Sequence, residues 1–189
     1  MIIAIFALTT ICAQCGPAVD PSLTKAIIQV ESGGNPYAIG DNTDKRSYFP
    51  ASKSNAVQLA SYLLSQRHNI DMGLMQMNSC HLGKSGLSLG GLFDPCSNVS
   101  FGTRLLAENF RTYSGNPDKR QVLFKVLSAY NTGSAWRGPG YINRILEAAK
   151  APYRVMVVNP PKESGSKKSK ILNRDEYRFS SLFFAGGKL

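Results

Sequence analysis

Apolar residues recur three or four positions apart over five stretches of the chain, with polar residues between them. This spacing places the apolar side chains on one face of a helix and predicts amphipathic helices. The intervening segments are rich in glycine, asparagine, aspartate and proline, which favour turns, and a short hairpin is predicted across residues 39–42. The sequence therefore predicts a mainly α (α+β) protein with a small β-hairpin or sheet, its helices covering residues 21–32, 54–68, 99–113, 118–132 and 141–148.

The helix over residues 21–32 carries an acid on its apolar face. Asp20 is placed to cap the helix, and Pro21 stands at the first helical position, where its missing N–H costs nothing. Glu31 follows Ile27 by four residues, so it extends the face that the apolar side chains occupy. The glycines at 33–34 then end the helix within a turn. An ionisable side chain in this position is costly unless it has a function.

Glu31 is therefore the candidate catalytic residue. Burial against the apolar face and the negative end of the helix dipole both favour its protonated form, which a general acid needs. A glutamate that only forms hydrogen bonds with the backbone at a helix end is the alternative, and this helix alone does not decide between them.

Two later segments offer neutral hydrogen-bonding groups. Gln76 and Asn78 stand at alternate positions in a methionine-rich run, where an extended segment would place both amides on one face. Amides both donate to and accept from sugar hydroxyl and acetamido groups. Tyr130 and Asn131 stand at a predicted helix end, where ligand-binding groups commonly project. A core segment whose amides pair with the backbone is the alternative for the first pair.

The composition is that of one soluble globular domain with an unusual charge. The chain has 189 residues, a net charge of +10 and a pI near 9.6, which favours an anionic partner such as a wall polymer bearing carboxylates. Nucleic acid is disfavoured, because aromatic residues do not alternate with Lys and Arg and no DNA-binding motif is present. We expect a signal segment over residues 1–14, a main domain over 15–152 and a basic, partly disordered tail over 153–189, where an interaction segment is the alternative.

Residues 1–13 form an uncharged apolar run that is too short to span a bilayer. A secretory signal cut near Ala13 fits this run best, with a buried first helix as the alternative. If the protein is exported, Cys80 and Cys96 are the plausible disulfide pair among the four cysteines. The two histidines have no third ligand at a telling spacing, so neither a metal nor a cofactor is expected.

The chain contains three motifs in order: Glu31-Ser32, Gly73-Leu74-Met75-Gln76 and Ala129-Tyr130-Asn131. Together they resemble the motifs of the lytic transglycosylases with a lysozyme-like fold. Further matches, in residues 15–21, 35–40 and 93–98, resemble the VirB-type branch associated with type IV secretion and conjugation. The resemblance extends from about Cys15 to Tyr141.

The resemblance implies a periplasmic enzyme that cleaves the β-1,4 bond between N-acetylmuramic acid and N-acetylglucosamine in peptidoglycan, beside a cleft bordered by the small sheet. Glu31 would act as acid and then base while the substrate's acetamido group assists, giving a 1,6-anhydro ring. Gln76, Tyr130 and Asn131 would bind the sugar, Ser32 would orient the acid, and Asn78 is a weaker candidate. Type IV secretion components are the implied protein partners.

Two other functions stay open. A hydrolytic lysozyme-like muramidase would need a second carboxylate to position water, for which Asp41, Asp44 and Asp71 are the candidates. A non-catalytic peptidoglycan-binding scaffold would need only the basic surface.

Overall fold

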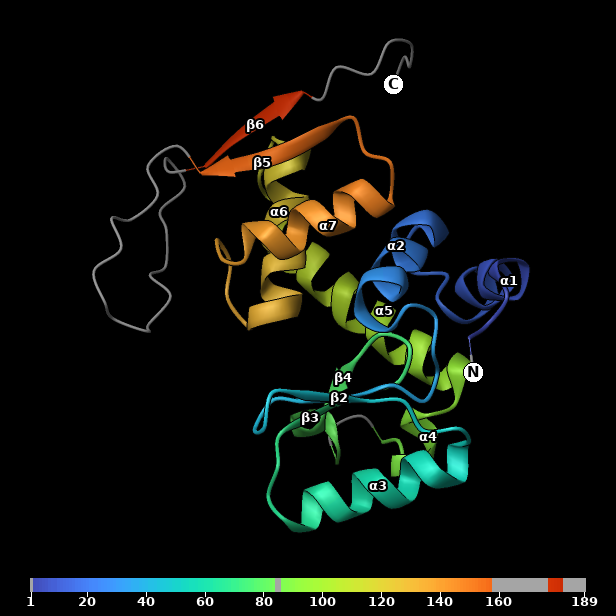
Figure 1. Cartoon of the computed structure of the whole chain (residues 1–189). Helices are drawn as coiled ribbons and strands as arrows, with labels where there is room; N and C mark the ends of the chain where they lie inside the picture. The colour runs from blue at the N-terminus through green and yellow to red at the C-terminus, as the bar shows by residue number, and fades with distance from the viewer. Residues whose placement is uncertain (1, 84–85, 158–176, 182–189) are drawn as a thin grey trace. The chain divides into compact units, whose positions relative to one another are not determined.

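A computed structural model of the chain describes residues 2–83, 86–157 and 177–181. The chain forms two compact units, residues 1–105 and 106–189 (Figure 1). The first holds α1 (Ile5–Cys15), α2 (Pro21–Ser32), β1 (Ile39–Asp41), β2 (Arg46–Tyr48), α3 (Lys53–Ser65), β3 (Ile70–Met72), β4 (Met77–Asn78), the 3₁₀ helix η1 (Ser79–His81), α4 (Leu89–Leu92) and the start of α5 (Pro95–Tyr113). The second holds the end of α5, α6 (Lys119–Thr132), α7 (Pro139–Ala148), β5 (Tyr153–Val157) and β6 (Tyr177–Ser181).

The first unit contains a small antiparallel sheet with strand order β2-β1-β3-β4. Ile39 of β1 pairs with Tyr48 of β2 on one side and with Met72 of β3 on the other. The predicted hairpin is confirmed, although its turn falls at residues 42–45, where Lys45 has a φ of 58°. In Figure 1 α3 lies along this sheet, and it contacts β3. Together with the predominance of helix, this sheet gives the mainly helical, lysozyme-like α+β architecture that the sequence predicts.

The cap predicted for α2 is confirmed. Asp20 accepts hydrogen bonds from the backbone amides of Ser22 (2.8 Å) and Leu23 (3.4 Å), and Pro21 is the first helical residue. Ile27 and Ile28 are fully buried. These two side chains anchor the helix in the core of the first unit and so fix where its last turn lies.

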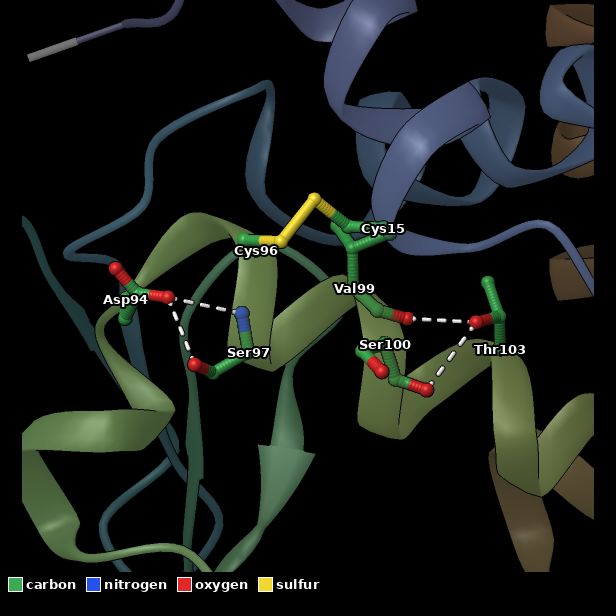
Figure 2. Close-up of a disulfide and its surroundings, with 7 residues drawn as sticks. All are labelled: Cys15, Asp94, Cys96, Ser97, Val99, Ser100 and Thr103. Carbon is green, nitrogen blue, oxygen red and sulfur yellow. Dashed lines mark hydrogen bonds between the residues drawn. A yellow bond between two sulfur atoms is a disulfide. The ribbon is translucent and has the colours of Figure 1, made fainter.

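Helix α5 begins earlier than the sequence predicts. The predicted helix starts at Val99, but the first turn of the observed helix is capped by Asp94, which accepts hydrogen bonds from the Ser97 amide (2.9 Å) and hydroxyl (2.8 Å) (Figure 2). The helix is continuous from Pro95. Asn98 therefore lies inside the first turn, where its side chain is buried and free to bond to other segments.

The predicted disulfide between Cys80 and Cys96 is wrong. Cys96 bonds to Cys15 at the end of α1, across a sequence separation of 81 residues, while Cys80 is free and exposed (Figure 2). The physical reason is the close approach of the two helices: a Cβ on Gly16 would lie 2.8 Å from Thr103 Cγ2 and 3.1 Å from Val99 Cγ1 of α5. The absence of a side chain at Gly16 lets Cys15 reach Cys96.

Helix α1 buries only part of its apolar surface. Leu8 and Cys12 are buried, whereas Ile5 and Phe6 are 63% and 86% exposed. Within the described residues, no helix is both long enough and apolar enough to cross a membrane. Removal of residues 1–13 as a signal segment stays a prediction.

The second unit packs α6 and α7 together, with β5 against α7. Asp118 caps α6 by accepting a hydrogen bond from the Arg120 amide (3.0 Å). Asn143 of α7 forms two hydrogen bonds with the backbone of Val155, of 2.8 and 2.7 Å. Strand β6 pairs with β5, so residues 153–157 and 177–181 of the expected tail form a two-stranded antiparallel sheet, whereas the rest of that tail, residues 158–176 and 182–189, lies outside the described residues.

Candidate active site

Glu31 lies in the last turn of α2, at the edge of the core of the first unit. The next two glycines, Gly33 and Gly34, have φ values of 60° and 81°, which side-chain-bearing residues adopt at a cost. They end the helix as the sequence predicts, and Glu31 is half-buried as a result. A half-buried carboxyl at a helix end is compatible with the acid role predicted for Glu31, which stays a prediction.

Ser32 joins the end of α2 to the loop between β3 and β4. Its Oγ lies 2.8 Å from the Leu74 carbonyl oxygen and 3.2 Å from the Ile28 carbonyl oxygen, so one hydroxyl proton serves both acceptors. The first contact spans 42 residues of sequence. These contacts tie the end of α2, next to Glu31, to the β3–β4 loop, and an orienting role for Ser32 stays a prediction.

The run around Gln76 is a tight loop, not the extended segment expected from the sequence. Gly73 to Gln76 connect β3 to β4, with the Gln76 amide donating to the Gly73 carbonyl (3.2 Å). Gly73 and Gln76 have φ values of 79° and 46°. Because the chain reverses here, Gln76 and Asn78 do not share the face of one strand.

The Gln76 side chain is held against β1. Its Nε2 donates to the carbonyl oxygens of Gly73 (2.8 Å) and Ala38 (3.1 Å), which uses both amide protons. A Cβ on Gly40 would lie 3.0 Å from Gln76 Oε1, so Gly40 leaves room for the amide. The group that Gln76 can offer to a ligand is therefore the acceptor Oε1.

Asn78 belongs to a hydrogen-bonded network on the sheet. Its Nδ2 donates to Asn69 Oδ1 and Asp71 Oδ1, both at 2.7 Å, and its Oδ1 accepts from the Cys80 amide at 3.0 Å. Asn42 Nδ2 donates to the other oxygen of Asp71 at 2.6 Å. These contacts give Asn78 a structural role that competes with the expected substrate contact.

Asp41 also has structural partners. It is buried, its Oδ2 lies 2.8 Å from His68 Nδ1, and its Oδ1 accepts from the backbone amides of Thr43 (2.9 Å) and Asp44 (3.3 Å). Burial of the carboxyl raises its pKa, but the hydrogen bonds from His68 and the two amides outweigh this and hold the pKa below its usual range. Asp41, Asp44 and His68 bring potential metal-ligand atoms within 4.8 Å of one another. We assign the group to stabilisation of the β1–β2 hairpin.

Tyr130 and Asn131 lie in the last turn of α6, in the second unit, where Gly133 (φ 70°) ends the helix. Tyr130 is half-buried and Asn131 is exposed. The following loop folds back on this turn, since a Cβ on Gly138 would lie 3.2 Å from Asn131 Nδ2. The phenol and the amide thus occupy a helix end braced by a loop, as the sequence predicts.

Sequence reasoning missed the residue behind the Gly73–Gln76 loop. Asn98 is fully buried, and its side chain forms three hydrogen bonds with backbone groups around that loop. A signal was present: Asn98 precedes Gly102 and Leu106 by four and eight residues, so it continues the buried stripe of α5. A polar residue in such a stripe indicates a buried hydrogen-bonding role.

Comparison with known protein families shows which family the chain belongs to. The family model of the transglycosylase SLT domain matches residues 9–138, and the chain belongs to this family. The matched range includes Glu31, Gln76 and Tyr130. No solved structure matches the chain significantly.

Curated relatives give a more particular likeness. The chain is 35% identical over 139 residues to "Protein virB1" of Agrobacterium fabrum, covering 72% of this chain and 57% of that protein. It is 32% identical over 158 residues to "Protein virB1" of Rhizobium radiobacter, covering 82% and 66%. It is 33% identical over 156 residues to "Type IV secretion system protein virB1" of Brucella abortus, covering 78% and 66%. The matched part of the chain thus spans 57–66% of the length of these relatives.

Proposed function

We propose that this protein is a lytic transglycosylase that cleaves the β-1,4 bond between N-acetylmuramic acid and N-acetylglucosamine in peptidoglycan. The observation that carries the proposal is the setting of Glu31. It lies half-buried at a helix end, next to a serine that binds the Leu74 carbonyl, within a chain of the transglycosylase SLT family.

The surroundings of the other acids support a reaction with a single carboxylate. Hydrolysis by two carboxylates needs a second one free to activate water or attack the sugar. Both oxygens of Asp41 accept protein hydrogen bonds, and so do both oxygens of Asp71. Asp44 is exposed on the β1–β2 turn. The hydrogen bonds of Asp41 and Asp71 favour transglycosylation over a muramidase that uses either of them, since substrate assistance removes the need for a second acid.

In the proposed reaction, the protonated Glu31 carboxyl donates its proton to the glycosidic oxygen, and the bond between that oxygen and the muramyl C1 breaks. The acetamido oxygen of the substrate attacks C1 and holds it as a cyclic intermediate. The Glu31 carboxylate then removes the proton of the muramyl 6-hydroxyl, whose oxygen displaces the acetamido oxygen at C1. The product is a 1,6-anhydro ring, Glu31 is protonated again, and no water is consumed.

The remaining candidates have proposed binding roles. Gln76 Oε1 accepts a hydrogen bond from a sugar N–H or O–H group, since both of its own amide protons are engaged. Tyr130 and Asn131 bind the sugar and its acetamido group. Asn78 contributes least, because its amide already has partners in the protein.

We further propose that the protein acts in the periplasm and opens the wall locally for a type IV secretion or conjugation apparatus. The relative from Brucella abortus is a type IV secretion system protein, which supports this setting. The net charge of +10 suits a polymer that bears carboxylates. A non-catalytic scaffold would share the charge but would not need an acid at residue 31.

Mass spectrometry of digested peptidoglycan tests the proposal. Transglycosylation predicts products that end in 1,6-anhydro-N-acetylmuramic acid, each one water lighter than the hydrolysed equivalent. Digestion that yields only hydrolysed reducing ends would establish the muramidase alternative. Binding to peptidoglycan without any release of fragments would establish the scaffold.

A further inference from the structure

Two of the three hydrogen bonds of Asn98 hold the β3–β4 connection that also binds Ser32, and the third goes to the end of α4. Its Oδ1 accepts from the Met75 amide at 2.8 Å, and its Nδ2 donates to the carbonyl oxygens of Met72 (3.0 Å) and Leu92 (2.8 Å). Met72 ends β3 and Met75 lies within the Gly73–Gln76 loop. One fully buried amide therefore fixes the loop at its beginning and at its centre.

The same loop is bound from its other side by α2. The Leu74 carbonyl, which belongs to the same peptide group as the Met75 amide, accepts from the Ser32 hydroxyl at 2.8 Å. Leu74 and Met75 are both fully buried. Successive backbone groups of the loop are thus held by Asn98 and by Ser32, in a packed interior that transmits small displacements.

The contact between Asn98 and the loop leaves no spare room. A Cβ on Gly73 would overlap Asn98 Nδ2 and the Leu92 carbonyl oxygen, and a Cβ on Gly102, one turn further along α5, would lie 2.6 Å from the sulfur of Met75. The loop cannot move toward α5 and would lose buried hydrogen bonds if it moved away.

We propose that Asn98 is a positioning residue for the reaction, acting through the Gly73–Gln76 loop on Ser32 and Gln76. It fixes the position of the Leu74 carbonyl oxygen. Because Ser32 bonds to this oxygen, that position determines where the last turn of α2 and the Glu31 carboxyl lie. It also fixes the backbone of Gln76, whose side chain bonds to Gly73 and Ala38. The effect of Asn98 on kcat rests on the proposed function. Its effect on the position of the loop rests on the hydrogen bonds alone.

The alternative is that Asn98 only stabilises the fold. Thr103 provides a matched control, because it is also a buried polar residue of α5, but its hydroxyl bonds only to the Val99 (2.8 Å) and Ser100 (3.2 Å) carbonyls of the same helix (Figure 2). Thr103→Val removes that hydroxyl without touching the loop. A change that acts only through stability should behave alike in the two variants.

The kinetic test compares Asn98→Asp, Asn98→Ser, Ser32→Ala and Thr103→Val as full-length proteins on peptidoglycan, well below the lowest melting temperature. Each Asn98 variant should lose about 10–100-fold in kcat, because displacement of a catalytic group by an ångström costs that much. Thr103→Val should keep wild-type kcat. The Asn98→Asp/Ser32→Ala double variant should be little slower than the slower single variant, since both act through one loop. Wild-type kcat in a folded Asn98 variant, or multiplied losses in the double variant, would overturn the proposal.

Amide hydrogen exchange provides a readout that does not depend on activity. Exchange at the Met75 and Gln76 amides should be at least about tenfold faster in folded Asn98→Asp or Asn98→Ser protein and unchanged in Thr103→Val. Equal acceleration in the Thr103 variant would assign Asn98 a purely structural role. If the wild type gives hydrolysed products but the Asn98 variants still show the kcat loss and faster exchange, the proposed function fails and the positioning role stands.

Discussion

Removing the Cys15–Cys96 disulfide should destabilise the protein, and the expected loss in free energy of unfolding depends on which cysteines are paired. A cross-link that spans 81 residues lowers the chain entropy of the unfolded state, which stabilises the folded state by about 4.5 kcal/mol. Cys15→Ser should therefore lower the free energy of unfolding by about that amount, or the melting temperature by about 10–18 °C for a chain of this size. Cys80 is free and exposed, so Cys80→Ser should leave both quantities unchanged.

Urea denaturation of the oxidised proteins, followed by circular dichroism, measures these differences. With reductant present, the wild type and Cys15→Ser should unfold at the same urea concentration, which shows that the loss comes from the cross-link. The predicted but incorrect Cys80–Cys96 bridge would close a loop of about 16 residues worth about 3 kcal/mol, and it would make Cys80→Ser the destabilising variant. That result, or a disulfide-linked peptide containing Cys80, would refute the pairing.

Three further predictions concern the sheet and its loop. Gly40→Ala should displace the side chain of Gln76, since the new Cβ would lie 3.0 Å from Oε1, and steady-state kinetics should show a several-fold higher KM with the melting temperature nearly kept. Gly73→Ala should lower the free energy of unfolding by at least about 2 kcal/mol in urea, because the residue has a φ of 79° and its Cβ meets buried atoms. The lowered pKa of Asp41 means that its contribution to stability is present above the unfolded pKa of about 3.9 and is lost as the pH falls through the folded value. Between pH 7 and pH 2, the urea midpoint of Asp41→Asn should accordingly fall less steeply with pH than that of the wild type. An equally steep fall would contradict the stabilising role assigned to the Asp41 carboxylate.

Local sequence rules predicted α2, α3, α6 and α7 well because each is encoded by neighbouring residues. Asp20 and Pro21 start α2, two left-handed glycines end it, and the position of Glu31 follows from the spacing of the isoleucine one turn earlier. The residues that determine a helix end all lie within a few positions of it. The candidate acid could therefore be found without a structure.

The errors arose where a feature depends on segments far apart in the chain. The disulfide depends on the approach of α1 to α5, and nothing in the spacing of four cysteines specifies that approach. Asn98 satisfies the helix-cap preference as well as Asp94 does, and only the packing of the β3–β4 loop against α5 shows that its amide is needed elsewhere. The loop itself reverses at Gln76, which has a φ of 46° that its residue type does not predict.

The most direct test of the account is a digest of peptidoglycan by the wild type, Glu31→Gln and Glu108→Gln, with released fragments separated and weighed. Glu31→Gln keeps the shape of the side chain but removes a general acid and base worth about 10²–10⁴ in rate. Glu108 is exposed on α5, so its variant should match the wild type. We predict 1,6-anhydro products from the wild type and from Glu108→Gln, and a rate at least about 100-fold lower from Glu31→Gln. Undiminished release of fragments by Glu31→Gln would show that the acid at the end of α2 is not the catalyst.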